Sequence, residues 1–143
     1  MKLSSPAFPD GGAIPPRFTC DGEDESPPLA WDEVPEGTQA FALTVQDPDA
    51  RDFLHWLLSN IPGDLRELPE GQGDAIGTPG STSFGTAGWG GPCPPSGTHR
   101  YVFTLYALSS QLTGTGDFDA VLEGVDRLAI GKAELTGVYT RGG

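Results

Sequence analysis

Glycine and proline interrupt this chain from end to end and make up about a quarter of it, with 21 glycines and 14 prolines among 143 residues. Proline removes a backbone hydrogen-bond donor, and glycine loses more conformational entropy than any other residue when it enters a helix. A chain interrupted this often does not suit a helical bundle, but it suits short strands joined by tight turns. The sequence therefore predicts a mainly β protein, and its length predicts a single domain spanning residues 1–143 around one core.

Four segments indicate strands, at residues 41–46, 55–61, 100–107 and 133–140. The second of them runs into the dipeptide 62–63, Pro-Gly, which stops a strand. The third is apolar on both faces, and this pattern predicts a position in the interior of a sheet.

A single good helix is predicted from Asp117 to about Gly131. Asp117 is a favourable N-cap residue, and apolar residues recur at helical spacing to give one buried stripe. The connection 63–98 is long, glycine-rich and without periodicity. Loops of this length in compact domains are usually functional or disordered, and the segment at its C-terminal end favours function. The fold predicted from these patterns is mainly β with one or two short helices.

The chain is strongly acidic, with a formal net charge of −12 and only two lysines, Lys2 and Lys132. Nucleic acids and anionic membrane surfaces need clustered basic residues, so both are disfavoured as partners. No stretch approaches the length of a membrane span, and the N-terminus has no apolar run of signal-peptide length. We therefore expect a cytoplasmic protein without integral membrane association. The acidic, lysine-poor composition also suits a high-salt cytoplasm.

Two short segments, 47–56 and 90–101, hold the only two histidines, His55 and His99. Each segment begins with turn residues and carries its histidine beside an aromatic or basic residue. A neutral imidazole offers one donor and one acceptor, and a protonated one offers two donors, which suits a phosphate or carboxylate oxygen. The pattern predicts that both segments form one anion-binding pocket.

Asp47 and Asp49 flank Pro48 at the end of a predicted strand, where binding groups are often presented. Pro48 fixes its own backbone and restricts Asp47 to extended conformations, so both carboxylates are held rigidly. We expect one to face the pocket and the other to be buried against Arg100. Tyr101 follows His99 by two residues on a strand and should point to the same side.

The glycine-rich and proline-rich segment 90–97 predicts a rigid rim for the pocket, formed around Gly91 and Pro92. Glycines allow backbone N–H groups to approach an anion. Two cysteines, Cys20 and Cys93, are too few for a disulfide framework, and we expect two reduced, partly buried thiols. Whether these thiols meet in space stays open at this stage.

These segments also resemble a known family. The two histidine-bearing segments are similar to the signature regions of the phosphatidylethanolamine-binding proteins, also called Raf-kinase-inhibitor-like proteins. The segments 20–22, 26–31, 60–62 and 133–139 resemble the short prokaryotic branch, and the match runs from about Leu3 to Arg141. The most specific part is the run Gly-Pro-Cys-Pro-Pro-Ser-Gly-Thr-His-Arg-Tyr at 91–101.

The resemblance implies a β-sandwich with a Greek-key-type sheet. It also implies a shallow pocket for phosphate or phosphorylated head groups. Carried over residue by residue, the ligand-binding set is Asp47, Asp49, His55, Gly91, Pro92, His99 and Tyr101. Two positions depart from the family pattern: Arg51 stands where proline is usual, and the segment 124–128 lacks a histidine that prokaryotic relatives often carry.

Several functions stay open from the sequence. The leading hypothesis is a non-enzymatic binding protein for a small anion. No cofactor is expected, because the phosphate-loop and dinucleotide fingerprints are absent. The alternatives are an inhibitor of a kinase or serine protease that uses the pocket rim, and a hydrolase with an Asp–His base but no evident nucleophile. Metal binding by the aspartates and histidines is disfavoured because their spacing matches no standard site. A homodimer also stays open.

Overall fold

The computed structural model describes residues 1–142, in which two antiparallel sheets pack face to face. The larger sheet has the order β6-β4-β3-β7-β8. Its strands are β3 (Ala40–Asp47), β4 (Phe53–Pro62), β6 (Thr78–Pro79), β7 (Gly97–Leu108) and β8 (Ala129–Arg141). The smaller sheet has the order β1-β2-β5, with β1 (Lys2–Ser4), β2 (Leu29–Asp32) and β5 (Glu67–Leu68). The expected β-sandwich is confirmed.

The larger sheet has a Greek-key-type strand order. Strand β4 pairs with β3 and then with β6, and β7 returns after a long connection to pair with the other side of β3. This arrangement places the fourth strand beside the first. The predicted strands 41–46, 55–61 and 100–107 all lie within these strands, and β7 is an interior strand, as its apolar faces predicted.

Two hydrophobic clusters hold the layers together. The first lies between the sheets and includes Phe18, Trp31, Phe41, Trp56 and Phe103, all buried. The second lies on the other face of the larger sheet and is covered by helix α2 (Phe118–Leu128). The apolar stripe predicted from helical spacing is confirmed, since Val121 and Val125 of α2 are buried in this second cluster.

The helix begins where the sequence predicted. The carboxylate of Asp117 accepts a hydrogen bond from the backbone N–H of Ala120 at 3.2 Å, and so caps the first turn. A second, short helix, α1 (Gly73–Ile76), lies in the connection that was expected to be a loop. No helix among residues 1–142 is long and apolar enough to cross a membrane.

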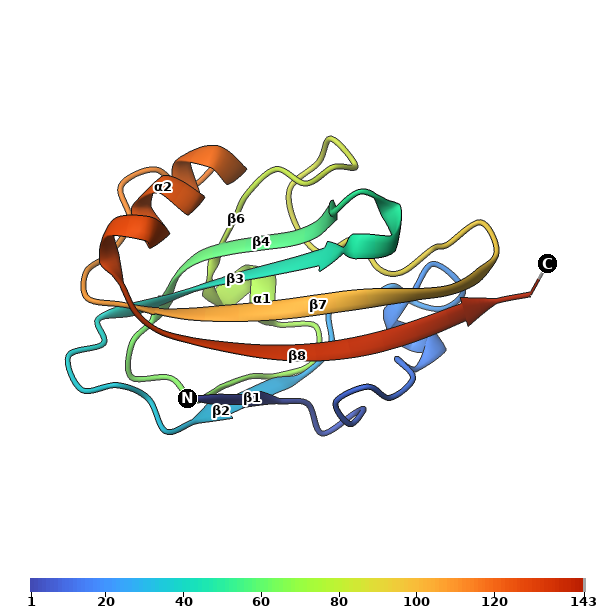
Figure 1. Cartoon of the computed structure of the whole chain (residues 1–143), viewed down its shortest axis with the longest axis horizontal. Helices are drawn as coiled ribbons and strands as arrows, with labels where there is room; N and C mark the ends of the chain where they lie inside the picture. The colour runs from blue at the N-terminus through green and yellow to red at the C-terminus, as the bar shows by residue number, and fades with distance from the viewer. Residues whose placement is uncertain (143) are drawn as a thin grey trace.

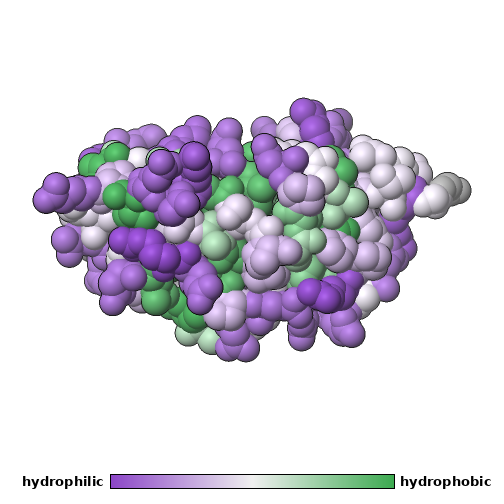
Figure 2. Space-filling view, turned by 90° about the horizontal axis from the view of Figure 1, so that it is seen from below, coloured by the Kyte–Doolittle hydropathy of each residue, from purple (hydrophilic) through white to green (hydrophobic). Residues whose placement is uncertain are grey.

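Figure 1 shows the long strands β3, β4, β7 and β8 running side by side, with α2 at one end of them. The turn after β3, which forms the short 3-10 helix η2 (Pro48–Ala50), lies at the opposite end. Figure 2 shows the molecule from below, with hydrophilic residues over most of this face and apolar residues gathered toward its middle.

The expectation of two reduced cysteines is wrong. Cys20 and Cys93 form a disulfide, with their Cα atoms 5.5 Å apart. Cys20 follows the short helix η1 (Pro16–Phe18), and Cys93 lies just before β7. The two residues are 73 positions apart, so only the path of the two loops brings them together.

Candidate functional site

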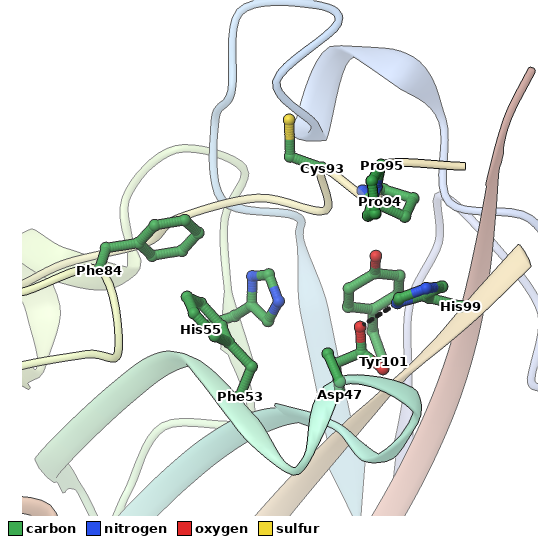
Figure 3. Close-up of a pocket in the computed structure, with 10 residues that line it drawn as sticks. Asp47, Phe53, His55, Phe84, Cys93, Pro94, Pro95, His99 and Tyr101 are labelled. Atoms are coloured by element: carbon green, nitrogen blue, oxygen red, sulfur yellow. Dashed lines mark hydrogen bonds and ion pairs between the residues drawn. The ribbon is translucent and has the colours of Figure 1, made fainter. Parts of the chain in front are cut away.

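A pocket of about 190 Å³ opens at the end of the larger sheet where β3 ends and β4 and β7 begin (Figure 3). Both histidines line it. The complete lining is Asp47, Ala50, Phe53, His55, Phe84, Cys93, Pro94, Pro95, His99 and Tyr101. The two histidine-bearing segments thus meet in one pocket.

Asp47 is the last residue of β3, and its carboxylate organises the turn and the pocket together. One oxygen, Oδ1, accepts the backbone N–H of Asp49 at 2.8 Å. The other, Oδ2, accepts a hydrogen bond from Nδ1 of His99 at 2.6 Å. Asp47 is only 2% exposed. A buried carboxylate with fixed partners holds the His99 ring in one orientation.

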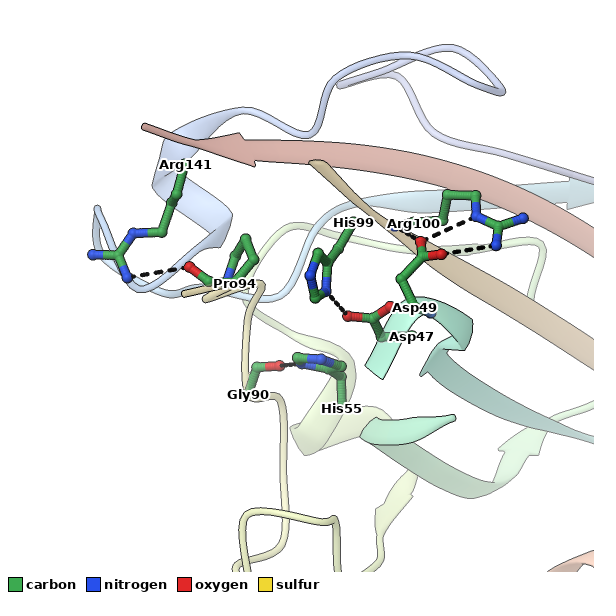
Figure 4. Close-up of polar contacts among 8 residues, drawn as sticks. All are labelled: Asp47, Asp49, His55, Gly90, Pro94, His99, Arg100 and Arg141. Carbon is green, nitrogen blue, oxygen red and sulfur yellow. Dashed lines mark hydrogen bonds and ion pairs between the residues drawn. The ribbon is translucent and has the colours of Figure 1, made fainter. Parts of the chain in front are cut away.

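Asp49 turns away from the pocket and binds Arg100 (Figure 4). The Arg100 guanidinium donates to both carboxylate oxygens at 2.9 and 3.1 Å, and the Arg100 backbone N–H adds a bond of 2.9 Å. The hydrogen bonds from the Arg100 guanidinium are the main reason that the pKa of Asp49 falls to about 2. The predicted division of the two carboxylates is therefore seen, but the Asp49–Arg100 pair lies at the surface rather than buried.

His55 lies on β4 and is nearly buried beneath the pocket rim. Its Nδ1 donates to the carbonyl oxygen of Gly90 at 2.7 Å, since a carbonyl can only accept. Burial lowers the pKa of His55, and it outweighs the opposing effects of the Gly90 carbonyl and of nearby carboxylates. The neutral ring then leaves Nε2 as an acceptor.

The two histidines therefore share one arrangement. Each uses Nδ1 to bind a protein acceptor, Gly90 for His55 and Asp47 for His99, which leaves both Nε2 atoms for a ligand. Figure 3 shows the two imidazoles and the ring of Tyr101 around the space below Pro94 and Pro95. Among residues 1–142, the Tyr101 hydroxyl has no hydrogen-bond partner, and burial raises its pKa, so it remains a proton donor.

Aromatic and proline side chains form the apolar part of the pocket. Phe53 packs against His55 and Phe84, with ring centroids 5.0 and 4.8 Å apart. Phe84 comes from the long connection between β6 and β7 and is 47% exposed. An exposed phenyl ring at a pocket mouth is available to an apolar part of a ligand or partner.

Comparison with known proteins identifies this architecture. A model of the family "Phosphatidylethanolamine-binding protein" matches residues 4–140. The chain belongs to the phosphatidylethanolamine-binding protein family. A UPF0098 protein of Methanothermobacter thermautotrophicus is 47% identical, and the alignment covers 99% of this chain and 100% of the relative.

Two solved structures agree over nearly the whole chain. The phosphatidylethanolamine-binding protein homologue CT736 of Chlamydia trachomatis superimposes with a TM-score of 0.91 at 35% identity, covering 98% of this chain and 97% of that one. Escherichia coli YbcL gives a TM-score of 0.89 at 32% identity, covering 98% of each chain. The resemblance seen in the sequence is confirmed.

One relative bears on location. LppC of Mycobacterium tuberculosis, whose name describes it as a lipoprotein, is 37% identical over 97% of this chain and 72% of its own length. A cytoplasmic location for the present family member therefore stays a prediction.

Gly91 and Pro92 do not line the pocket of this family member, although they were expected to form its rim. Both are buried behind the rim. The Gly91 N–H donates to Oδ1 of Asp24 at 2.8 Å, and the Gly90 N–H donates to the carbonyl of His55 at 3.0 Å. The backbone donors expected to meet an anion are thus already used, and the rim consists of the segment 93–95 instead.

Arg51, at the position where relatives usually have proline, adopts a left-handed conformation with φ 56°. Proline cannot reach this value, because its ring holds φ near −65°. The turn after η2 is therefore built differently here. Arg51 is exposed and does not line the pocket, and helix α2, which lacks the third histidine, contributes no lining residue either.

The sequence did not identify Phe53 and Phe84 as the apolar wall of the pocket. Phe53 had a usable signal, because it precedes His55 by two residues and shares its side of β4. Phe84 had no signal of its own. It belongs to the long connection 63–98, which the sequence indicated only in general terms as functional. Within residues 1–142, no group of three or more histidine, cysteine, aspartate or glutamate side chains is arranged to hold a metal ion.

Proposed function

We propose that this protein is a non-enzymatic binding protein for a small anionic group, phosphate-like or carboxylate. The observation that carries the proposal is the convergence of His55, His99 and Tyr101 on one pocket, with each Nδ1 atom already bound to the protein. The Tyr101 hydroxyl donates directly to an anion. Each histidine donates through Nε2 once it is protonated, and accepts from a ligand hydroxyl while it is neutral.

The dimensions support a small ligand. A pocket of about 190 Å³ accommodates a phosphate or carboxylate with a short substituent. Asp47, His99 and Tyr101 lie on the β3 and β7 side, and Phe53 and Phe84 lie on the other side next to His55 of β4, so the site suits an organic anion with an apolar part.

The lining argues against covalent catalysis. It includes no serine, threonine or lysine, and the sulfur of Cys93 is held in the disulfide. The Asp47–His99 pair resembles a catalytic base, but no nucleophile lies beside it in the lining. Binding is therefore better supported than hydrolysis.

Inhibition of a protein such as a kinase or protease is the second candidate. Phe84 favours it, because a 47% exposed phenyl ring at the pocket mouth is a suitable protein contact. Copurification of the wild-type protein with a stoichiometric partner, lost in Phe84→Asp, would support this function.

The anion hypothesis is tested by titrating phosphate while the ring signals of His55 and His99 are followed by NMR. We expect both sets of signals to shift and to saturate together. Replacing both histidines by alanine should abolish binding. Retention of wild-type affinity in a folded double variant contradicts the proposal.

Tyr101→Phe is the sharpest single substitution, because it removes only a hydroxyl that has no partner in the described protein. We expect about a fivefold to tenfold loss of phosphate affinity, the usual effect of one hydrogen bond, with little change in stability. Tyr106→Phe, on the same strand but outside the pocket, is the matched control and should bind normally.

A further inference from the structure

The segment behind the pocket rim, residues 90–92, is firmly anchored to the rest of the protein. Gly90 exchanges hydrogen bonds with His55, the Gly91 N–H binds Asp24, and the carbonyl of Pro92 accepts the Cys20 N–H at 3.2 Å. Residues 90–92 therefore have fixed positions that do not depend on the cysteine side chains.

The rim itself, residues 93–95, which we call the outer rim, makes fewer hydrogen bonds to the rest of the protein. Cys93 is covalently joined to Cys20. The guanidinium of Arg141 contacts the Cys93 sulfur and the Pro94 carbonyl oxygen, each at 3.5 Å, and the distance to the carbonyl oxygen is long for a hydrogen bond (Figure 4 shows the contact with Pro94). The disulfide is thus the strongest restraint on the wall that Pro94 and Pro95 give to the pocket.

The disulfide is also accessible from solvent. Cys20 and Cys93 are both exposed residues. In Figure 3 the sulfur of Cys93 points away from the histidines, toward the outside of the pocket. Exposed disulfides are the ones that thiols reach without unfolding of the protein, whereas buried ones are protected.

We propose that Cys20–Cys93 is a reversible thiol–disulfide exchange site whose reduction releases the outer rim and weakens ligand binding. The co-reactant is a dithiol reductant. Its thiolate attacks the Cys20 sulfur, the S–S bond breaks, and Cys93 leaves as a thiolate. The second thiol of the reductant then attacks the mixed disulfide and releases Cys20, so two electrons pass to the protein, which takes up two protons as its thiols form, and the reductant becomes a disulfide.

Arg141 favours attack of the reductant on the Cys20 sulfur rather than on the Cys93 sulfur. Its guanidinium lies 3.5 Å from the Cys93 sulfur and stabilises the departing thiolate. The charge is partly offset by Asp21, whose carboxylate binds the same guanidinium at 3.0 Å. We therefore assign Cys93 as the leaving group.

The effect on binding rests on the proposed anion function. A released rim must be ordered again when a ligand binds, and this ordering lowers the affinity. The two prolines limit the freedom of the loop, so we expect a moderate effect, a loss of about tenfold in phosphate affinity on reduction.

The experiment treats the folded protein with dithiothreitol and measures two quantities. Amide hydrogen exchange at Cys93, Ser96 and Gly97 reports the rim without any ligand, and NMR titration with inorganic phosphate reports the affinity. The variant Cys20→Ala breaks the bond without changing a residue that lines the pocket. It should bind like the reduced wild type and should not respond to dithiothreitol.

Faster exchange at the rim together with weaker binding, in a protein that stays folded, supports the proposal. Unchanged exchange and affinity after complete reduction would overturn it, as would reduction that requires a denaturant or unfolds the chain. If the oxidised protein does not bind phosphate at all, the anion function fails, and rim release is then decided by hydrogen exchange alone.

Discussion

His55 is the residue whose burial most directly affects ligand binding, because burial changes the protonation of its ring. Burial lowers the pKa of its imidazole, although the Gly90 carbonyl and the carboxylates of Asp47 and Asp24 act in the opposite direction. The neutral ring presents an acceptor at Nε2, whereas an anion requires a donor there. Anion binding must therefore favour protonation of His55, and the ligand and the proton should bind together.

This coupling predicts that anion affinity rises as the pH falls from about 8 to about 6, by at most about tenfold per pH unit for one proton. Sulfate is the suitable probe, because its own charge is constant over this range. Calorimetry in buffers of different ionisation enthalpy measures the proton uptake. His55→Gln should make the profile shallower, leaving only the contribution of His99, and a flat profile in the wild type would contradict the coupling.

Phe84 gives a second prediction for a single residue. Its ring packs edge-on against Phe53 at 4.8 Å and is largely open to solvent, so Phe84→Ala should cost little stability. We expect about a fivefold to tenfold loss of affinity for phenyl phosphate, from lost aromatic contact, and no change for inorganic phosphate. Ile130→Ala, at the other large exposed apolar residue, is the control. Equal losses for both ligands would show that Phe84 acts on the fold instead.

The strands and the main helix were the elements that the sequence predicted best. Strands β3 and β4 bury nearly every residue, so their apolar runs have few alternative structures. Helix α2 carries both a capping aspartate, Asp117, and a buried stripe at helical spacing. In each case the local pattern and the tertiary environment require the same structure, which is why prediction succeeded.

The loops were harder to predict, because their roles depend on contacts between segments far apart in the sequence. Asp24 belongs to an acidic run that reads as solvated, yet it accepts the N–H of Gly91, 67 residues away. The Cys20–Cys93 disulfide and the position of Phe84 in the pocket likewise depend on contacts between distant segments. Apart from the two histidine-bearing segments, the sequence does not indicate which loops will meet, so the back and one wall of the pocket were found only from the structure.

At the scale of the whole molecule, the surface carries a large excess of negative charge. The formal net charge is −12, and the chain has only eight lysines and arginines. In the described residues, five of these cations already pair with acids: Lys2, Arg17, Arg100, Lys132 and Arg141. Most carboxylates therefore have no cation beside them, and their mutual repulsion disfavours the compact state.

Screening of this repulsion should stabilise the protein. We expect the Tm to rise by about 5 °C between low salt and about 0.5 M KCl, equivalent to about 1–2 kcal/mol for a chain of this length. The rise should level off near 1 M, where the Debye length is only about 3 Å. Sodium, potassium and tetramethylammonium chloride should act alike, since screening depends only on ionic strength. A Tm that keeps rising with KCl but not with tetramethylammonium would instead show specific cation binding by the acidic surface, the behaviour expected of adaptation to a high-salt cytoplasm. A Tm that does not change with any of the three salts would mean that the folded state already separates its carboxylates well enough to avoid repulsion.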